Sequence, residues 1–202
     1  MKKTYMLSLM VALGLSACVA PEYVQPTPNN KAEKPVSLGI DDADIDKVAR
    51  EMIDSMLASP YFTNSKAGHY LVVSRVVNDT MQHFDTDLIT AKIERALRQT
   101  GRVKVTSALG ANGARDEATY NMRELRDNDE FDQGTIAAKG SLKAADLSLS
   151  GKIIQRNTKI SGSKQRVDYY FQLRLTDTGT GLIEWDEEVK VNKAGSNRSV
   201  TW

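Results

Sequence analysis

The stretch Val167–Leu175, VDYYFQLRL, alternates large apolar residues with mostly polar ones. An apolar side chain at every second position is typical of a β-strand with one buried face. The same period of two recurs in residues 147–153 and 183–191. Hairpin-forming residues separate the three stretches, namely Ser161-Gly162-Ser163 and Thr178-Gly179-Thr180-Gly181. We therefore predict that the last third of the chain is a three-stranded antiparallel meander.

The alternation also assigns side chains to the two faces of this meander. It places Leu173 in the core and the neighbouring Arg174 in solvent. In the last strand it places Ile183 and Trp185 on the buried side, so we expect Trp185 to be a core residue.

Five further elements are predicted upstream, the last of which is a helix around residues 117–126. Apolar residues at helical spacing indicate a helix over residues 41–58 and another over residues 85–99. Residues 70–77, YLVVSRVV, predict a strand that is buried on both faces for much of its length. A short strand is expected within residues 102–107. The fold class is therefore α+β: a small antiparallel or mixed sheet with helices packed on it.

The N-terminus predicts export and lipidation. Two lysines precede an apolar stretch over residues 5–15, which is shorter than the roughly 20 residues that a membrane-spanning helix needs. The sequence Leu15-Ser16-Ala17-Cys18 then resembles the bacterial lipobox. We predict a signal peptide over residues 1–17 and acyl chains, such as palmitate, on Cys18. Because Val19 follows the cysteine in place of Asp, we expect anchoring in the outer membrane, with the protein facing the periplasm.

The remaining boundaries follow from composition. Residues 18–40 hold four of the five prolines of the chain and too few apolar residues for a core, so they are predicted to be a flexible tether that begins at the lipidated cysteine. Residues 41–193 are the predicted globular α+β domain, and residues 194–202 are a polar tail.

Charge and cysteine content exclude several classes of function. Removal of the signal peptide takes away Lys2 and Lys3 from the 27 basic residues, which leaves 25 against 26 acidic ones. A net charge near −1 gives no electrostatic case for nucleic-acid binding. Cys18 is the only cysteine, which excludes internal disulfides and cysteine-rich metal sites.

The search for catalytic or metal-binding residues finds none. His69 and His83 lack a metal-ligand spacing, and we interpret both as surface or strand-edge residues. The residues from Ser161 to Lys164 match Ser-x-x-Lys, but they lie at a predicted hairpin tip. Asp127–Asp132 begins like a calcium loop but has Phe131 at a ligand position, which favours a solvated acidic loop. We predict no enzyme, no cofactor and no metal.

A recognition loop is the remaining candidate. Asn78-Asp79-Thr80 stands where the predicted buried strand emerges, a place where loops often carry binding residues. A plain turn is an equally good interpretation of these residues alone.

Three stretches resemble the LpoB-type outer-membrane lipoproteins, which activate penicillin-binding proteins: residues 70–80, residues 93–107 and residues 173–185. The resemblance implies a fold like the N-terminal domain of TolB. It also implies a non-catalytic role, in which the domain docks on a bifunctional class A penicillin-binding protein and stimulates peptidoglycan synthesis. A basic contact position of the family aligns with Asn78, Asp79 and Thr80, where this chain carries Asp79. The alternative is a structural or assembly lipoprotein of an envelope machine, such as a secretion, curli-like or flagellar apparatus.

Overall fold

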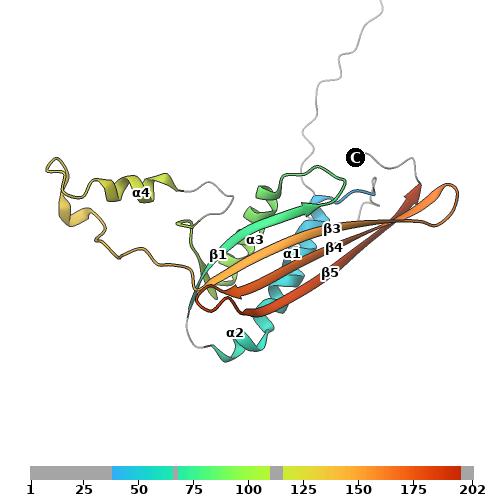
Figure 1. Ribbon diagram of the computed structural model, residues 1–202, viewed down its shortest axis with the longest axis horizontal. Helices are drawn as coiled ribbons and strands as arrows, with labels where there is room; N and C mark the ends of the chain where they lie inside the picture. The colour runs from blue at the N-terminus through green and yellow to red at the C-terminus, as the bar shows by residue number, and fades with distance from the viewer. Residues whose placement is uncertain (1–37, 66–67, 110–115, 197–202) are drawn as a thin grey trace, which may run out of the picture. The chain divides into compact units, whose positions relative to one another are not determined.

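The computed structural model describes residues 38–65, 68–109 and 116–196 of the chain. Its centre is a five-stranded sheet with the order β2-β1-β3-β4-β5 (Figure 1). The strands are β1 (His69–Asp79), β2 (Val103–Val105), β3 (Leu147–Lys159), β4 (Lys164–Asp177) and β5 (Ile183–Ser196). β1 runs parallel to both β2 and β3, while β3, β4 and β5 are antiparallel. The predicted mixed sheet and its meander are therefore confirmed.

Two long helices, α1 (Asp42–Ala58) and α3 (Thr86–Thr100), lie together on one face of this sheet (Figure 1). α1 begins with a capping box, because the side chains of Asp41 and Asp44 accept each other's backbone N–H. α3 is capped by Asp85 and ends at Gly101, whose φ of 68° is a conformation that glycine adopts readily. Both helices are where the sequence predicts them. We call the opposite side of the sheet the outer face.

Shorter helical segments complete the described chain. They are α2 (Pro60–Asn64), α4 (Glu117–Glu124) and the 3-10 turn η1 (Gln133–Thr135). α4 lies within the helix predicted around residues 117–126, whereas α2 is not anticipated by the sequence.

The core fills the space between the sheet and the two long helices. All five apolar residues of the inward-facing β4 row are buried: Val167, Tyr169, Phe171, Leu173 and Leu175. Burial, with the nearby Asp44 carboxylate, raises the pKa of Tyr169 to about 12, so its hydroxyl stays protonated and donates to the Leu38 carbonyl at 3.0 Å.

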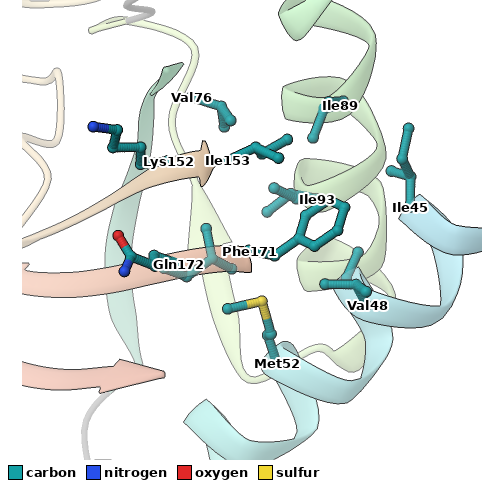
Figure 2. A pocket seen from close by; sticks show the side chains of 12 residues that line it. Ile45, Val48, Met52, Val76, Ile89, Ile93, Lys152, Ile153, Phe171 and Gln172 are labelled. Atoms are coloured by element: carbon teal, nitrogen blue, oxygen red, sulfur yellow. The ribbon is translucent and has the colours of Figure 1, made fainter. Parts of the chain in front are cut away.

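A cavity beside Phe171 is lined almost wholly by apolar side chains (Figure 2). Lys152 and Gln172 direct their polar ends away from the helices there, so the cavity offers no polar group that would orient a ligand.

The inward placement of Ile183 is wrong. Leu175 pairs with Trp185, whereas Thr176 pairs with Ile183, so Glu184 is an extra residue that shifts the register. One extra residue moves every side chain beyond it to the other face. Ile183 is consequently 52 % exposed, while Trp185 is half-buried against the core.

Of the two interpretations of His69, the surface residue is wrong, while its place as the first residue of β1 agrees with a residue at the edge of a strand. His69 is 8 % exposed and opens β1 beneath the rings of Tyr61 and Phe62. Its Nδ1 lies 2.7 Å from Asp146 Oδ2 and its Nε2 lies 2.8 Å from Ser65 Oγ. The second oxygen of Asp146 accepts the backbone N–H of Tyr70 at 2.6 Å. Ser65, His69 and Asp146 are thus hydrogen-bonded in the order of a hydrolase triad. Here, however, the two carboxylate oxygens of Asp146 bond the first residues of β1, and they join the start of β1 to the start of β3.

Candidate functional site

Two of the three predicted docking residues shape the loop that follows β1. Asn78 Oδ1 accepts from the backbone N–H of Thr80 at 3.1 Å and from its hydroxyl at 2.7 Å. Asn78 Nδ2 donates to the Gln82 carbonyl at 2.9 Å. The side chains of Asn78 and Thr80 are therefore engaged inside the loop, and Asp79 is the one of the three that has its charge on the outer face.

Asp79 occupies the first position of a row that crosses the outer face. Its partners in register on β3, β4 and β5 are Ile154, Tyr170 and Lys190. The Asp79 carboxylate forms an ion pair with Lys152 Nζ at 2.7 Å, and the two side chains are 59 % and 43 % exposed. A solvent-exposed pair of this kind contributes at most about 1 kcal/mol. Asp79 can therefore exchange Lys152 for a cation on a partner at little cost.

A basic and aromatic cluster continues from this row. Lys190 Nζ lies 5.1 Å and Arg156 Cζ 5.7 Å from the centre of the Tyr170 ring, both at cation–π distance. Beside Tyr170, Asp168 is buried and pairs with Arg166 at 3.1 Å and with Lys190 at 3.7 Å. Tyrosine and arginine are enriched in the centres of protein interfaces. This cluster is not among the sites predicted from the sequence, although the outward position of Tyr170 in the alternation is a signal for it.

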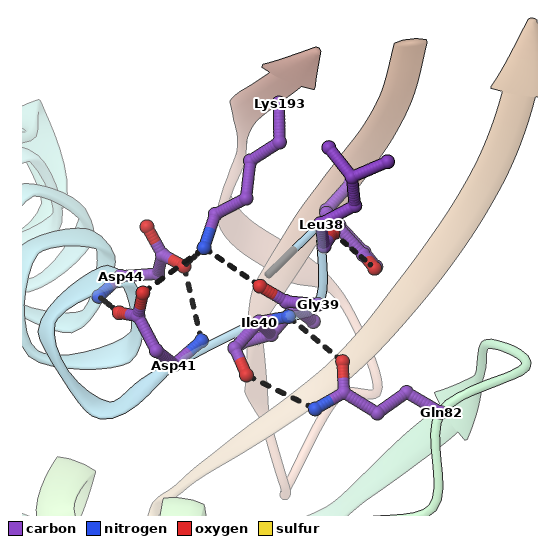
Figure 3. A network of polar contacts seen from close by, with 8 residues as sticks. Leu38, Gly39, Ile40, Asp41, Asp44, Gln82 and Lys193 are labelled. Carbon is purple, nitrogen blue, oxygen red and sulfur yellow. Dashed lines mark hydrogen bonds and ion pairs between the residues drawn. The ribbon is translucent and has the colours of Figure 1, made fainter. Parts of the chain in front are cut away.

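The loop after β1 is also tied to the point where the chain enters the domain (Figure 3). The Gln82 side chain accepts the Ile40 backbone N–H at 2.7 Å and donates to the Ile40 carbonyl at 3.0 Å. Lys193 Nζ donates to the Gly39 carbonyl at 2.6 Å and pairs with the carboxylates of Asp41 and Asp44. These contacts, with the burial of Leu38 and Ile40, extend the folded domain three residues before its predicted start at residue 41.

The contact between Lys193 and Asp41 predicts that part of the protein's stability is lost at acid pH. Burial opposes ionisation of Asp41, but the Asp44 backbone N–H and the Lys193 ammonium outweigh it and lower the pKa of Asp41. A carboxylate with a lowered folded-state pKa stabilises the fold above its unfolded pKa of about 3.9, and that contribution is lost as pH falls through the folded pKa. Asp41→Asn keeps a good helix cap and should show a smaller loss of melting temperature below about pH 4 than the wild type. Thermal melts from pH 7 to 2, with Asp54→Asn on the exposed side of α1 as control, check this; identical acid profiles for wild type and Asp41→Asn would contradict it.

The other sequence candidates are placed as follows. Cys18 lies outside the described residues. The hairpin between β3 and β4 contains Ser161 and Lys164, which are joined through their backbones, with Ser161 N–H donating to the Lys164 carbonyl at 3.1 Å. Within residues 38–65, 68–109 and 116–196, no group of histidine, cysteine or acidic side chains is arranged to hold a metal ion. None of the helices in these ranges combines the length and the apolar content needed to cross a membrane.

The chain is similar to one family of proteins and to several solved structures. The model of a family described as peptidoglycan-synthase activator LpoB matches residues 44–191. The NMR structure of E. coli LpoB is 15 % identical, with a TM-score of 0.45 over 97 % of this chain and 90 % of that one. The LpoB C-terminal domains from Escherichia coli and Salmonella enterica are 18 % and 17 % identical, each with a TM-score of 0.45 over 73 % of this chain and 98 % of theirs. No curated protein was found to match the chain.

Proposed function

The chain belongs to the LpoB family of peptidoglycan-synthase activators, and from this premise we propose that it binds a class A penicillin-binding protein and activates it. The family match, which spans α1 to β5, is the observation that carries the proposal. Members of this family are activators, so the chain is not itself an enzyme. The chemistry would belong to the synthase, and this domain would act by binding.

Activation by a non-catalytic partner requires differential binding. A protein that binds the active form of a synthase more tightly than its resting form shifts the population toward the active form. The surface that we assign to this contact is the outer face around Asp79, including the loop of Asn78, Asp79 and Thr80. Its support is the hydrogen bonding of Asn78 and Thr80, which holds the loop in one shape before binding and so lowers the entropy lost on docking.

The direct test is stimulation of a purified class A synthase from the same envelope. Glycan polymerisation and cross-linking should both rise when the mature protein is added, and the increase should saturate with its concentration. The alternative role, in assembly of an envelope machine, predicts no effect on either rate. Unchanged rates at a saturating concentration would therefore count against the proposed function.

The anchor is a second part of the proposal. The Leu15–Cys18 lipobox supports lipidation of Cys18, and two or three acyl chains hold a protein stably at a membrane where one chain does not. We expect Cys18→Ser to incorporate no labelled fatty acid and to be released from the outer membrane or retained as the uncleaved precursor. Metabolic labelling followed by membrane fractionation measures both. Equal labelling of wild type and Cys18→Ser would show that Cys18 is not the acylated residue.

A further inference from the structure

The chain leaves the sheet after β2 and returns at β3, and we call the connection between these two strands the excursion. The described part of this excursion from residue 116 includes α4 and η1, and no residue of either helix is buried. Four large apolar residues of the connection between β2 and β3 are 40–53 % exposed, where core residues would be covered: Leu109, Met122, Phe131 and Leu142. Side chains that are exposed in a segment without a core of its own are available for contact with a partner.

Residues 125–138 of the excursion nevertheless have a defined shape, because their own side chains hold the backbone. Arg126 donates to the carbonyls of Ala137 and Ala138 at 2.5–3.0 Å. The Gln133 amide donates to three carbonyls, those of Leu125, Asn128 and Phe131, and accepts the Asp127 backbone N–H at 3.2 Å. Gln133 thus holds the turn that carries Phe131.

Phe131 is the strongest anchor in this turn. Its side chain is 46 % exposed although the surrounding backbone is fixed by hydrogen bonds. Aromatic side chains dominate binding energy when they enter an apolar pocket on a partner. A fixed backbone also reduces the conformational entropy that binding would remove.

The charge around Phe131 indicates the chemistry of the partner. Residues 116–132 hold seven acidic side chains and two basic ones, Arg123 and Arg126. Both arginines donate to backbone carbonyls within the excursion. Asp129 and Glu130, which directly precede Phe131, are exposed. The complement of this surface is an apolar pocket rimmed by lysine or arginine.

We propose that residues 116–146 of this excursion are a second docking element, which inserts Phe131 into an apolar pocket of a basic protein surface. It is separate from the outer face around Asp79, and it does not depend on whether the synthase binds there. The outer face offers Asp79 beside a basic cluster, whereas the excursion offers an apolar anchor in an acidic setting. One chain would therefore offer two docking surfaces of different charge.

Photo-crosslinking in cells tests this proposal on the full lipoprotein. A benzophenone amino acid replaces Phe131, and in a matched control it replaces Leu182, which is 63 % exposed in the turn between β4 and β5. We expect an adduct from position 131 in which the partner's crosslinked peptide, identified by mass spectrometry, contains lysine or arginine beside apolar residues. Asp129→Lys with Glu130→Lys should reduce that adduct about tenfold or more, because like charges then face each other.

The alternatives have distinct outcomes. An adduct no stronger than that from position 182, or one whose yield is unchanged by the charge reversal, would overturn the docking element. Melting temperatures of the charge-reversed protein show whether it folds normally, as expected for exposed positions. The same crosslinker at position 79 reports on the outer face separately, so failure of one surface is not mistaken for failure of the other.

Discussion

Asp79→Arg is expected to remove most of the stimulation of the synthase while the protein remains folded. The side chain lies on the outer face, and its ion pair with Lys152 is solvent-exposed, so stability should change by at most about 1 kcal/mol. At an interface, a like-charge contact costs several kcal/mol, and each 1.4 kcal/mol is about tenfold in affinity. The concentration needed for half-maximal stimulation should therefore rise tenfold or more. Titration of synthase activity, with thermal melts in parallel, measures both effects.

Two further variants separate partner contact from the internal ion pair. Asp54→Arg makes the same charge change on the exposed side of α1 and should stimulate like the wild type. The double variant Asp79→Arg with Lys152→Asp restores an ion pair on the outer face with reversed charges. If Asp79 contacts the synthase, the double variant stays defective; recovery of full stimulation would show that only the internal pair matters. Full activity of a folded Asp79→Arg protein would exclude this loop from the interface.

The parts of the fold that the sequence predicted are those governed by local periodicity. α1 and α3 each bury one apolar stripe, and both end at capping residues that can be read directly from the chain. The β4 row from Val167 to Leu175 is continuous because no extra residue interrupts it. The short helix α2 is not predicted, because a proline directly after a helical pattern indicates the end of that helix. Proline lacks a backbone N–H, so it also fits the first turn of a helix, and Ser59-Pro60 here both ends α1 and begins α2.

The parts that it could not predict depend on residues far apart in the chain. Lys193 reads as an ordinary charged residue of a strand, yet it is buried against Gly39 and Asp41, about 150 positions earlier. His69 is buried because α2 and Asp146 meet over it. The cluster around Tyr170 likewise forms only when β3 and β5 bring Arg156 and Lys190 to either side of its ring. No local pattern specifies such long-range contacts. The sequence therefore indicates one loop as the candidate site, and only the structure shows the charged and aromatic side chains that lie beside it on the outer face.

Gly151 and Leu173 are expected to be energetically coupled in the core. They are direct partners across β3 and β4, opposite the irregular pairing between Val73 and Val76 in β1. A Cβ atom at Gly151 would lie 2.8 Å from Leu173 Cδ2 and 3.2 Å from the Gln172 carbonyl oxygen. Gly151→Ala should therefore destabilise the protein by about 1–3 kcal/mol through overpacking. Gly162→Ala, where the added Cβ meets nothing within 4 Å, is the matched control and should be neutral or slightly stabilising.

Leu173→Ala alone should cost about 2–5 kcal/mol, because the leucine is 7 % exposed in the core, whereas Arg174→Ala in solvent should change stability by no more than about 0.5 kcal/mol. The double variant Gly151→Ala with Leu173→Ala should lose less stability than the two single variants combined. The shorter side chain at position 173 removes the atom that clashes with the new methyl group. Contacting residues show coupling of about 0.5–3 kcal/mol in such cycles. Urea denaturation of the four proteins of the cycle measures it. Strict additivity would mean that the clash at Gly151 is with the Gln172 backbone rather than with Leu173, and equal midpoints for Leu173→Ala and Arg174→Ala would contradict the register of β4 itself.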